Sequence, residues 1–322
     1  MTNLTAPQFT NVDAAREHLE ALRWPDGAYC PHCGAFAVKR LPEQRGRATK
    51  AHPDGAVRKG IYQCNACRQQ FSVTVGTVFE RSKVPLHKWL LATRLLCSSK
   101  KGYSAHQMHR DLGVTYKTAW FMEHRIRAAM APSGDLPPMG GEGTMVEVDE
   151  TYIGRIKGVD GRIGGGVWHK MKVLSLIDRA TGEARSHVVP NTRVVTIAPI
   201  VQANLAPKAK LMTDEASVYR YFGWKFARHM TVNHSASEYV KRGDSSIHTN
   251  TIEGFFSIFK RGMRGIYQHC GEQHLQRYLA EFDFRYSNRA ALGINDEARA
   301  ATLLSQIGGK RLTYRRINGL AA

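Results

Sequence analysis

The sequence predicts an α/β fold in which a mixed five-stranded sheet with helices follows a small cysteine-rich module and a pair of helices. Three observations support this prediction. Two C-x-x-C pairs lie near the start of the chain, and helical patterns dominate from about residue 85 to 130. Strand and helix patterns then alternate to about residue 262.

The N-terminal module is predicted to span residues 1–82. Its first helix should run from Val12 to Arg23. Asn11 is suited to cap that helix, because an Asn side chain accepts hydrogen bonds from the first helical N–H groups. Trp24-Pro25 should end it, since proline cannot continue a helix.

The cysteine pairs predict one structural Zn²⁺. The pairs are Cys30 with Cys33, and Cys64 with Cys67. Two such pairs supply four thiolates for a closed tetrahedral site. His32 and His52 are alternative ligands in the same segment. The long interval between the pairs contains a basic insertion, RLPEQRGRATKAHPDGAVRKG.

Residues 83–130 are predicted to form a helix-turn-helix. In GYSAHQMHRDLGVTYKTAWFMEHRIRAAM, one helix ends at Gly113 and a second begins near Thr115. The second helix would enter the major groove of DNA. The candidate DNA-contacting side chains are Tyr116, Lys117, His124 and Arg125. The alternative is an ordinary helical hairpin with a solvated basic face.

Residues 131–144 (APSGDLPPMGGEGT) are predicted to be a linker because of their Pro and Gly content. The predicted order after the linker is strand, strand, strand, helix, strand, short helix, strand, helix. The corresponding segments are MVEVDETYIG, KVLSLID, EARSHVV, TIAPIVQANL, KLMTDEA, SVYRYFGW, HMTVNHS and NTIEGFFSIFKRGM. The RNase H-like fold has this order. It begins with three antiparallel strands, and two further strands then join the sheet in parallel, each after a helical connection. We predict this fold for residues 145–300, followed by a basic C-terminal tail at 301–322.

The predicted topology brings three acidic residues together. The first strand is central in this fold and the fourth lies beside it, so Asp149 and Asp214 should be neighbours. The last helix should bring Glu253 over them. Three converging carboxylates can hold two divalent metal ions, which phosphodiester chemistry uses. Glu147, on the same face of the strand as Asp149, and Glu150 are rival candidates.

The first turn of the last predicted helix can be interpreted in two ways. Asn250 and Glu253 fit a capping box, in which Asn250 caps the helix and Glu253 reaches back to it. Lys260 follows Glu253 by seven residues and therefore lies on the same helix face, where it could contact a DNA phosphate. Arg261 and Arg264 continue a basic stripe towards the expected DNA.

The composition agrees with a polyanionic partner. The 322 residues include 46 Lys and Arg against 27 Asp and Glu, a formal net charge of +19. A basic excess on more than one domain is typical of a protein that grips DNA, although it could also be a solvated surface. No apolar run approaches the ~20 residues of a membrane span, and the first ten residues lack the pattern of a signal peptide. We expect a reducing, cytoplasmic location near the nucleoid.

The segments VEVDETYIG, TDEAS-Y and HTNTIEGFFSIFKRGMRGIY resemble the DDE transposases of bacterial insertion sequences. The nearest subgroup has an N-terminal zinc ribbon and is related to the Merlin elements of eukaryotes. The resemblance covers roughly Pro25 to Arg289. It implies two Mg²⁺ or Mn²⁺ ions per active site, with Asp149 and Asp214 as the first two ligands. The third position in this group is Glu or Asn, so Glu253 and Asn250 both qualify. We favour Glu253, because a carboxylate neutralises two dications better.

The resemblance further implies binding of double-stranded DNA at terminal inverted repeats, metal-dependent strand cleavage and transfer of the freed end to target DNA. Synapsis of two ends implies a homodimer or a higher homo-oligomer on DNA. Two other functions use the same features. One is an RNase H-like nuclease without strand transfer, and the other is a catalytically silent DNA-binding protein derived from a transposase.

Overall fold

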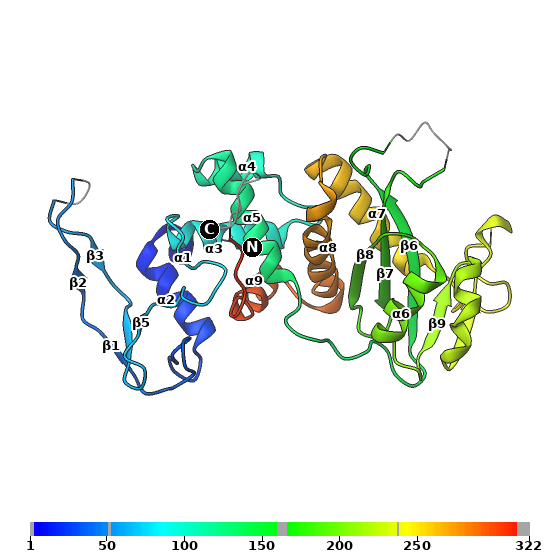
Figure 1. Cartoon of the computed structure of the whole chain (residues 1–322), viewed down its shortest axis with the longest axis horizontal. Coiled ribbons are helices and arrows are strands. Elements are labelled where there is room, and N and C mark those ends of the chain that lie inside the picture. Colours follow the sequence, from blue (N-terminus) through cyan, green and yellow to red (C-terminus); the bar gives the residue numbers. More distant parts are fainter. Residues whose placement is uncertain (1–2, 51–52, 160–165, 237, 314–322) are drawn as a thin grey trace. The chain divides into compact units, whose positions relative to one another are not determined.

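The computed structural model describes residues 3–50, 53–159, 166–236 and 238–313. The chain forms two compact units (Figure 1). The N-terminal unit comprises Met1–Ser98, Ala105–Ala129 and Asn295–Ala322, and the sheet unit comprises Ser99–Ser104 and Met130–Ile294. Within the described ranges, no helix is long and apolar enough to cross a membrane.

The N-terminal unit is built around helices from both ends of the chain. They are α1 (Pro7–Thr10), α2 (Val12–Arg23), α3 (Leu86–Ser98) and α9 (Asp296–Ser305). The predicted α2 is confirmed, and the Asn11 side chain accepts hydrogen bonds from the N–H groups of Asp13 and Ala14. Arg299 Nη1 donates to the Cys97 carbonyl at 2.8 Å, which fastens α9 to α3.

The C-terminal segment therefore differs from the prediction of a separate tail. The boundary expected at residue 300 falls inside α9, and residues 295–313 belong to the N-terminal unit. Apolar burial explains this placement, because Ala300, Leu303 and Leu304 are buried. Residues 314–322 of the predicted tail lie outside the described residues.

Two small antiparallel sheets follow α2. One contains β1 (Val38–Arg40), β4 (Tyr62–Cys64) and β5 (Gln70–Phe71); the other pairs β2 (Gln44–Arg45) with β3 (Val57–Arg58). Figure 1 shows β2 and β3 side by side in a narrow extension of the chain, which we call the β arm (residues 38–60). Trp24 packs edge-on against Tyr62 and Phe71, at ring-centroid distances of 5.1 and 6.0 Å.

The predicted helical pair consists of α4 (Ala105–Leu112) and α5 (Tyr116–Met130). Gly113 has a φ of +59°, a conformation that favours glycine and ends α4. The Thr115 hydroxyl accepts a hydrogen bond from the N–H of Thr118 at 3.2 Å and so caps α5. Both helix boundaries agree with the sequence prediction.

The sheet unit contains a five-stranded mixed sheet in the order β10-β9-β6-β7-β8. Its strands are β6 (Met145–Ile153), β7 (Met171–Asp178), β8 (Ala184–Val189), β9 (Lys210–Thr213) and β10 (Arg228–Thr231). Strands β6, β7 and β8 are antiparallel, whereas β9 is parallel to β6 and β10 is parallel to β9. This is the predicted RNase H-like arrangement, with β6 at the centre.

Helices cover both faces of this sheet. They are α6 (Val194–Asn204), the 3₁₀ turns η1 (Ser217–Tyr221), η2 (Gly223–Lys225), η3 (His234–Ala236) and η5 (Ala290–Leu292), α7 (Asn250–Gly262) with its π-helical continuation η4 (Met263–Tyr267), and α8 (Glu272–Ser287). Val148 and Leu174 pack in one apolar core with α6 and η1. Val173 and Ile177 point to the opposite face and pack with α7 and α8. The alternation of faces along β7 therefore builds two cores.

Helix α8, which the sequence analysis did not predict, holds the edge strand β8. The Asp283 carboxylate accepts hydrogen bonds from the N–H and hydroxyl of Ser186 at 2.8 and 2.7 Å. Gln276 accepts from the N–H of Val188 and donates to the Ser186 carbonyl. These bonds satisfy backbone groups that an edge strand would otherwise expose.

We predict that Asp283→Asn stabilises the protein at alkaline pH. Burial raises the pKa of Asp283 from 3.8 to about 7. Below about pH 4 the carboxyl is protonated in both the folded and the unfolded state, so its ionisation does not affect the free energy of unfolding. Between about pH 4 and pH 7 the unfolded state ionises more readily, so the free energy of unfolding falls, and above about pH 7 the loss is constant. An Asn amide can keep both contacts with Ser186 without a charge. The gain should be on the order of 2–4 kcal/mol at pH 8 and should vanish at pH 4, as measured by denaturant unfolding. An equal effect at both pH values would contradict this account.

Candidate active site and zinc site

The parallel pairing of β6 with β9 positions the first two acids. Glu147 lies opposite Met212 in this ladder. Continuing the register by two residues places Asp149 opposite Asp214, which follows the last residue of β9. Asp149, within β6, and Asp214, directly after β9, therefore lie at neighbouring positions near the centre of the sheet.

Asp149 lies among negative charges. Burial raises its pKa well above the ordinary value of 3.8, and the nearby charges of Asp214, Glu150 and Glu253 raise it further. Its Oδ1 accepts a hydrogen bond from the N–H of Glu150 at 2.7 Å, and Asp214 Oδ1 accepts one from the N–H of Ala216 at 3.0 Å. Among the described residues, neither Oδ2 atom accepts a hydrogen bond, so both are available to a cation.

The three acids do not form a tight cluster. Within the part of the chain that the structure describes, only the four cysteines bring three or more candidate ligand atoms within 4.8 Å of one another. Mutual repulsion favours wider spacing of Asp149, Asp214 and Glu253. Their carboxylate oxygens are nevertheless the donors that Mg²⁺ prefers, so the donor set fits that ion.

The predicted capping box at α7 is wrong. The helix begins at Asn250, and its N-cap residue is Thr249, whose side chain makes no capping bond. Asn250 is exposed. Glu253 Oε1 instead lies 3.3 Å from Thr249 Oγ1 and 3.3 Å from His234 Nε2. The N–H of Ile252, in the first turn of α7, donates a hydrogen bond to Glu147, which lies outside this helix.

Lys260, on α7 seven residues after Glu253, lies near enough to Asp149 for their charges to interact. Burial lowers the pKa of this half-buried amine, as does the positive charge of Arg264, whereas the charge of Asp149 raises it. Lys170 also lies near enough to lower that pKa, and the sequence analysis missed it because no motif marks the loop. Arg261 and Arg264 are exposed, and Arg261 donates hydrogen bonds to Ser257.

The rival acids on β6 have other partners. Glu147 is fully buried and accepts a hydrogen bond from Arg179 Nε at 2.5 Å. Glu150 faces the opposite core and accepts a hydrogen bond from the Tyr219 hydroxyl at 2.7 Å. Burial raises the pKa of Glu150 to about 7. Asp149 is therefore the acid of β6 that remains available to a ligand.

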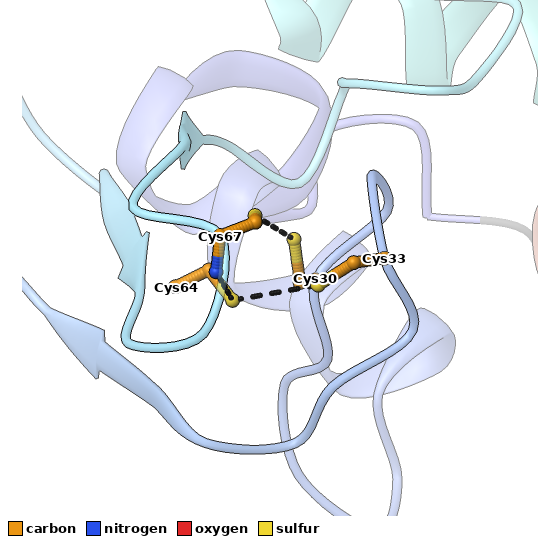
Figure 2. A group of neighbouring side chains, drawn as sticks. All are labelled: Cys30, Cys33, Cys64 and Cys67. Atoms are coloured by element: carbon orange, nitrogen blue, oxygen red, sulfur yellow. Dashed lines mark hydrogen bonds between the residues drawn. The ribbon is translucent and has the colours of Figure 1, made fainter.

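The four cysteines converge as predicted (Figure 2). Cys30 Sγ lies 3.6 Å from Cys67 Sγ, and Cys33 Sγ lies 3.6 Å from Cys64 Sγ. In a tetrahedral zinc–thiolate site with Zn–S bonds of about 2.3 Å, the sulfurs lie about 3.8 Å apart. The observed spacing fits a structural Zn²⁺. His32 is exposed and outside this cluster, and His52 lies outside the described residues.

Both C-x-x-C pairs adopt the same turn. The N–H of Gly34 donates to the Cys30 carbonyl, and the N–H of Arg68 donates to the Cys64 carbonyl. Gly34 and Arg68 have φ values of +76° and +60°. The N–H of Cys67 also donates to Cys64 Sγ at 3.4 Å and lowers the pKa of that thiol to about 7. A lowered thiol pKa favours the thiolate, the form that binds metal.

The candidate DNA-contacting residues of α5 divide into two groups. Tyr116 is 45% exposed and Lys117 is exposed, both in the first turn. His124 and Arg125 are buried, which does not agree with the prediction that they contact DNA. Arg125 donates to the Glu80 carbonyl at 2.7 Å and lies over the Trp89 ring. Packing inside the N-terminal unit therefore accounts for this part of α5.

The β arm presents a basic surface. Its exposed cationic side chains are Lys39, Arg40, Arg45, Arg47, Lys50, Arg58 and Lys59. Two acidic residues, Glu43 and Asp54, lie in the same segment. Lys59 forms ion pairs with Asp13 and Glu43, at 3.1 and 3.2 Å. The other cations lie on β1, on the β2–β3 pair and in the segment that joins these two strands.

Two family models of transposase domains match this chain. Residues 140–287 match the family model of the ISXO2-like transposase domain, and residues 11–70 match that of the transposase zinc-ribbon domain. The chain is 30% identical over 299 residues to an uncharacterized protein in transposable element ISH50 of Halobacterium salinarum, covering 86% of this chain and 91% of that one. It is 26% identical over 101 residues to an uncharacterized transposase-like protein of Haemophilus influenzae, covering 31% of this chain and 78% of that protein.

The matched regions contain the features that the geometry singled out. The transposase-domain match includes the whole sheet together with Asp149, Asp214 and Glu253. The zinc-ribbon match includes all four clustered cysteines. The chain belongs to the ISXO2-like family of DDE transposases of insertion sequences, with an RNase H-like domain preceded by a zinc ribbon.

Proposed function

We propose that the protein binds the terminal inverted repeats of its own element, cleaves DNA strands at their ends and joins the freed ends to target DNA. The observation that best supports this proposal is that the charges of Asp214 and Glu253 both act on Asp149, where the β6–β9 ladder directs the ends of the two strands to the same place. Because synapsis brings two ends together, the working form should be at least a homodimer.

Asp149, Asp214 and Glu253 would hold two Mg²⁺ or Mn²⁺ ions. Such ions supply Lewis acidity at the scissile phosphate and neutralise charge on the leaving oxygen. Glu253 suits the third position better than Asn250, since its charge acts on Asp149 whereas Asn250 is exposed and uncharged. Lys260 lies beside Asp149 and would bind a DNA phosphate at the site, which orients the strand for in-line attack.

The N-terminal unit would supply recognition of the repeat. The exposed first turn of α5, with Tyr116 and Lys117, suits contact with base edges, because recognition helices use their N-terminal residues in the major groove. The β arm would grip phosphates, since arginine side chains bind them in a bidentate manner. One structural Zn²⁺ per chain would hold the module that carries this arm.

The deciding experiment uses purified protein, Mg²⁺ and DNA that carries the repeats flanking its gene. The expected products are nicked or excised element ends and covalent joints between those ends and a target plasmid. Cleavage without any joint would identify a nuclease. Repeat binding without cleavage would identify a catalytically silent DNA-binding protein.

We predict that Asp149→Asn, Asp214→Asn and Glu253→Gln each lower the rate of strand cleavage by more than about a hundredfold. Changing a residue that only supports a metal ligand costs up to about a hundredfold, and loss of a ligand itself should cost more. Repeat binding, measured by fluorescence anisotropy, should stay within twofold of the unaltered protein. Asn250→Ala is the matched control. It should keep activity and change stability by less than about 0.5 kcal/mol, since Asn250 does not cap α7. If Glu253→Gln stays active while Asn250→Ala is folded but inactive, Asn250 and not Glu253 is the third metal ligand.

We predict about one Zn²⁺ per chain by elemental analysis, because the sulfur spacing fits one tetrahedral ion. Cys64→Ser or a strong chelator should unfold the zinc module, since structural zinc contributes on the order of 10 kcal/mol to folding. Limited proteolysis should then cut within residues 25–75 first. Cys270→Ser, at a cysteine outside the cluster, should leave zinc content and protease resistance unchanged. Metal-free protein that keeps repeat affinity would contradict a structural role.

We predict that Arg45→Gln/Arg47→Gln lowers the salt dependence of DNA binding. Each phosphate contact contributes about 0.9 to the slope of log affinity against log salt concentration, so the slope should fall by about 2. The control is Arg81→Gln/Lys83→Gln, which removes two exposed charges of the same unit outside the β arm. Equal loss of slope in both variants would mean that the arm has no special part in binding.

A further inference from the structure

A buried ion pair links the central strand to the start of α7. Glu147 Oε1 accepts from Arg179 Nε at 2.5 Å, and its Oε2 accepts from the N–H of Ile252 at 2.7 Å. Glu147 lies two residues before Asp149 on the same strand, and Ile252 directly precedes Glu253. One carboxylate thus connects the strand that carries the first acid to the helix that carries the third.

Arg179 fastens the chain that leads into α7. It follows the last residue of β7, and its N–H donates to the Met145 carbonyl at the start of β6. Its Nη1 donates to the Ser246 carbonyl and its Nη2 to the His248 carbonyl, both at 2.5 Å. The planar guanidinium therefore reaches Glu147 and two backbone groups at once, which a single ammonium cannot do.

His248 completes this arrangement as a neutral acceptor. Its Nδ1 accepts from Arg179 Nη2 at 2.9 Å and from the N–H of Asn250 at 3.3 Å. Burial and the charge of Arg179 lower its pKa, whereas the charges of Glu147 and Glu253 raise it. Because Nδ1 accepts both of these hydrogen bonds, the 3.4 Å separation of His248 Nδ1 from Glu147 Oε1 is a contact between two acceptors and not an ion pair.

This network replaces the missing side-chain cap of α7. The helix has no capping bond from Thr249, and an anion at a helix N-terminus is favoured by the free N–H groups and by the helix dipole. Glu147 supplies that anion from the sheet. The orientation of α7 at its first turn, where Glu253 lies, therefore depends on a side chain of β6.

We infer that Glu147 and Arg179 are positioning residues for the metal site, because they set the place of Glu253 relative to Asp149 and Asp214. The inference rests on the proposed function in one respect, namely that these three carboxylates bind the ions. It assigns no contact with DNA to either residue. Loss of the network should let the first turn of α7 move and weaken metal binding in a protein that is still folded.

The sharpest test is Arg179→Lys, because it keeps the charge and removes the planar fork. Mn²⁺ binding to the DNA-free protein, followed by the electron paramagnetic resonance signal of the free ion, should weaken by about tenfold or more, as is typical when a residue supporting a metal ligand is changed. The Mg²⁺ concentration for half-maximal strand cleavage should rise by a similar factor.

The matched control is Arg285→Lys, the same change in a buried Arg–Glu pair of the same unit. Arg285 pairs with Glu281 within α8. Both variants should lose thermal stability, but only Arg179→Lys should change metal affinity. If Arg179→Lys does not fold, Glu147→Gln compared with Glu281→Gln decides the question in the same way.

The outcomes separate this inference from the proposed function. Suppose that Asp149→Asn fails to bind Mn²⁺, but folded Arg179→Lys binds Mn²⁺ within twofold of the unaltered protein. This result would overturn the positioning role alone. Mn²⁺ binding that survives Asp149→Asn and Asp214→Asn would overturn the metal site itself. Equal weakening in Arg179→Lys and Arg285→Lys would show a general effect of stability and would also reject the positioning role.

Discussion

The parallel pairing of β9 with β6 is the constraint on which the candidate active site depends. The backbone ladder between β6 and β9 brings Asp149 close to Asp214, the residue after β9, although the two charges repel each other. Apolar side chains on the same strands hold the register, because Val146, Val148 and Leu211 are buried in one core. A shift of β6 by one residue would turn Asp149 into that apolar core and remove Val146 and Val148 from it, so burial of the valines protects the position of the acids.

Three acids within four residues of β6 have three different surroundings. Glu147 is buried and neutralised by Arg179, whereas Glu150 is buried on the other face beside the Tyr219 hydroxyl. Asp149 has no cationic hydrogen-bonding partner among the described residues, and Lys260 is the nearby cation that acts on it. Strand alternation explains the different faces, and the partners of Glu147 and Glu150 explain why Asp149 is the acid left for a ligand.

The two units rely on different sources of stability. The sheet unit buries apolar side chains on both faces of a five-stranded sheet, which suits a large domain. The zinc module has strands of two or three residues and a small aromatic cluster around Trp24, which alone buries little surface. Four converging thiols can replace that missing core, because metal binding fixes distant segments at one point.

Local patterns in the sequence determined much of this structure. The cysteine spacing predicted the thiol cluster, the Asn11 cap predicted the start of α2, and the strand order predicted the neighbourhood of Asp149 and Asp214. These features depend on residues close in sequence or on a topology with few alternatives. The pattern of residues in one sequence is therefore sufficient to predict these features.

Only the tertiary structure decided how α7 is capped, which basic residues of α5 are exposed and where α9 packs. Asn250 and Glu253 match a capping box, but the Ile252 N–H bonds to Glu147, 105 residues earlier in the chain. His124 and Arg125 have the composition of a DNA-reading face, but they are buried within the N-terminal unit. The Ile252 N–H and Arg125 each bond to a residue far away in sequence, because a buried polar group requires a partner, and α9 packs where its apolar side chains are buried.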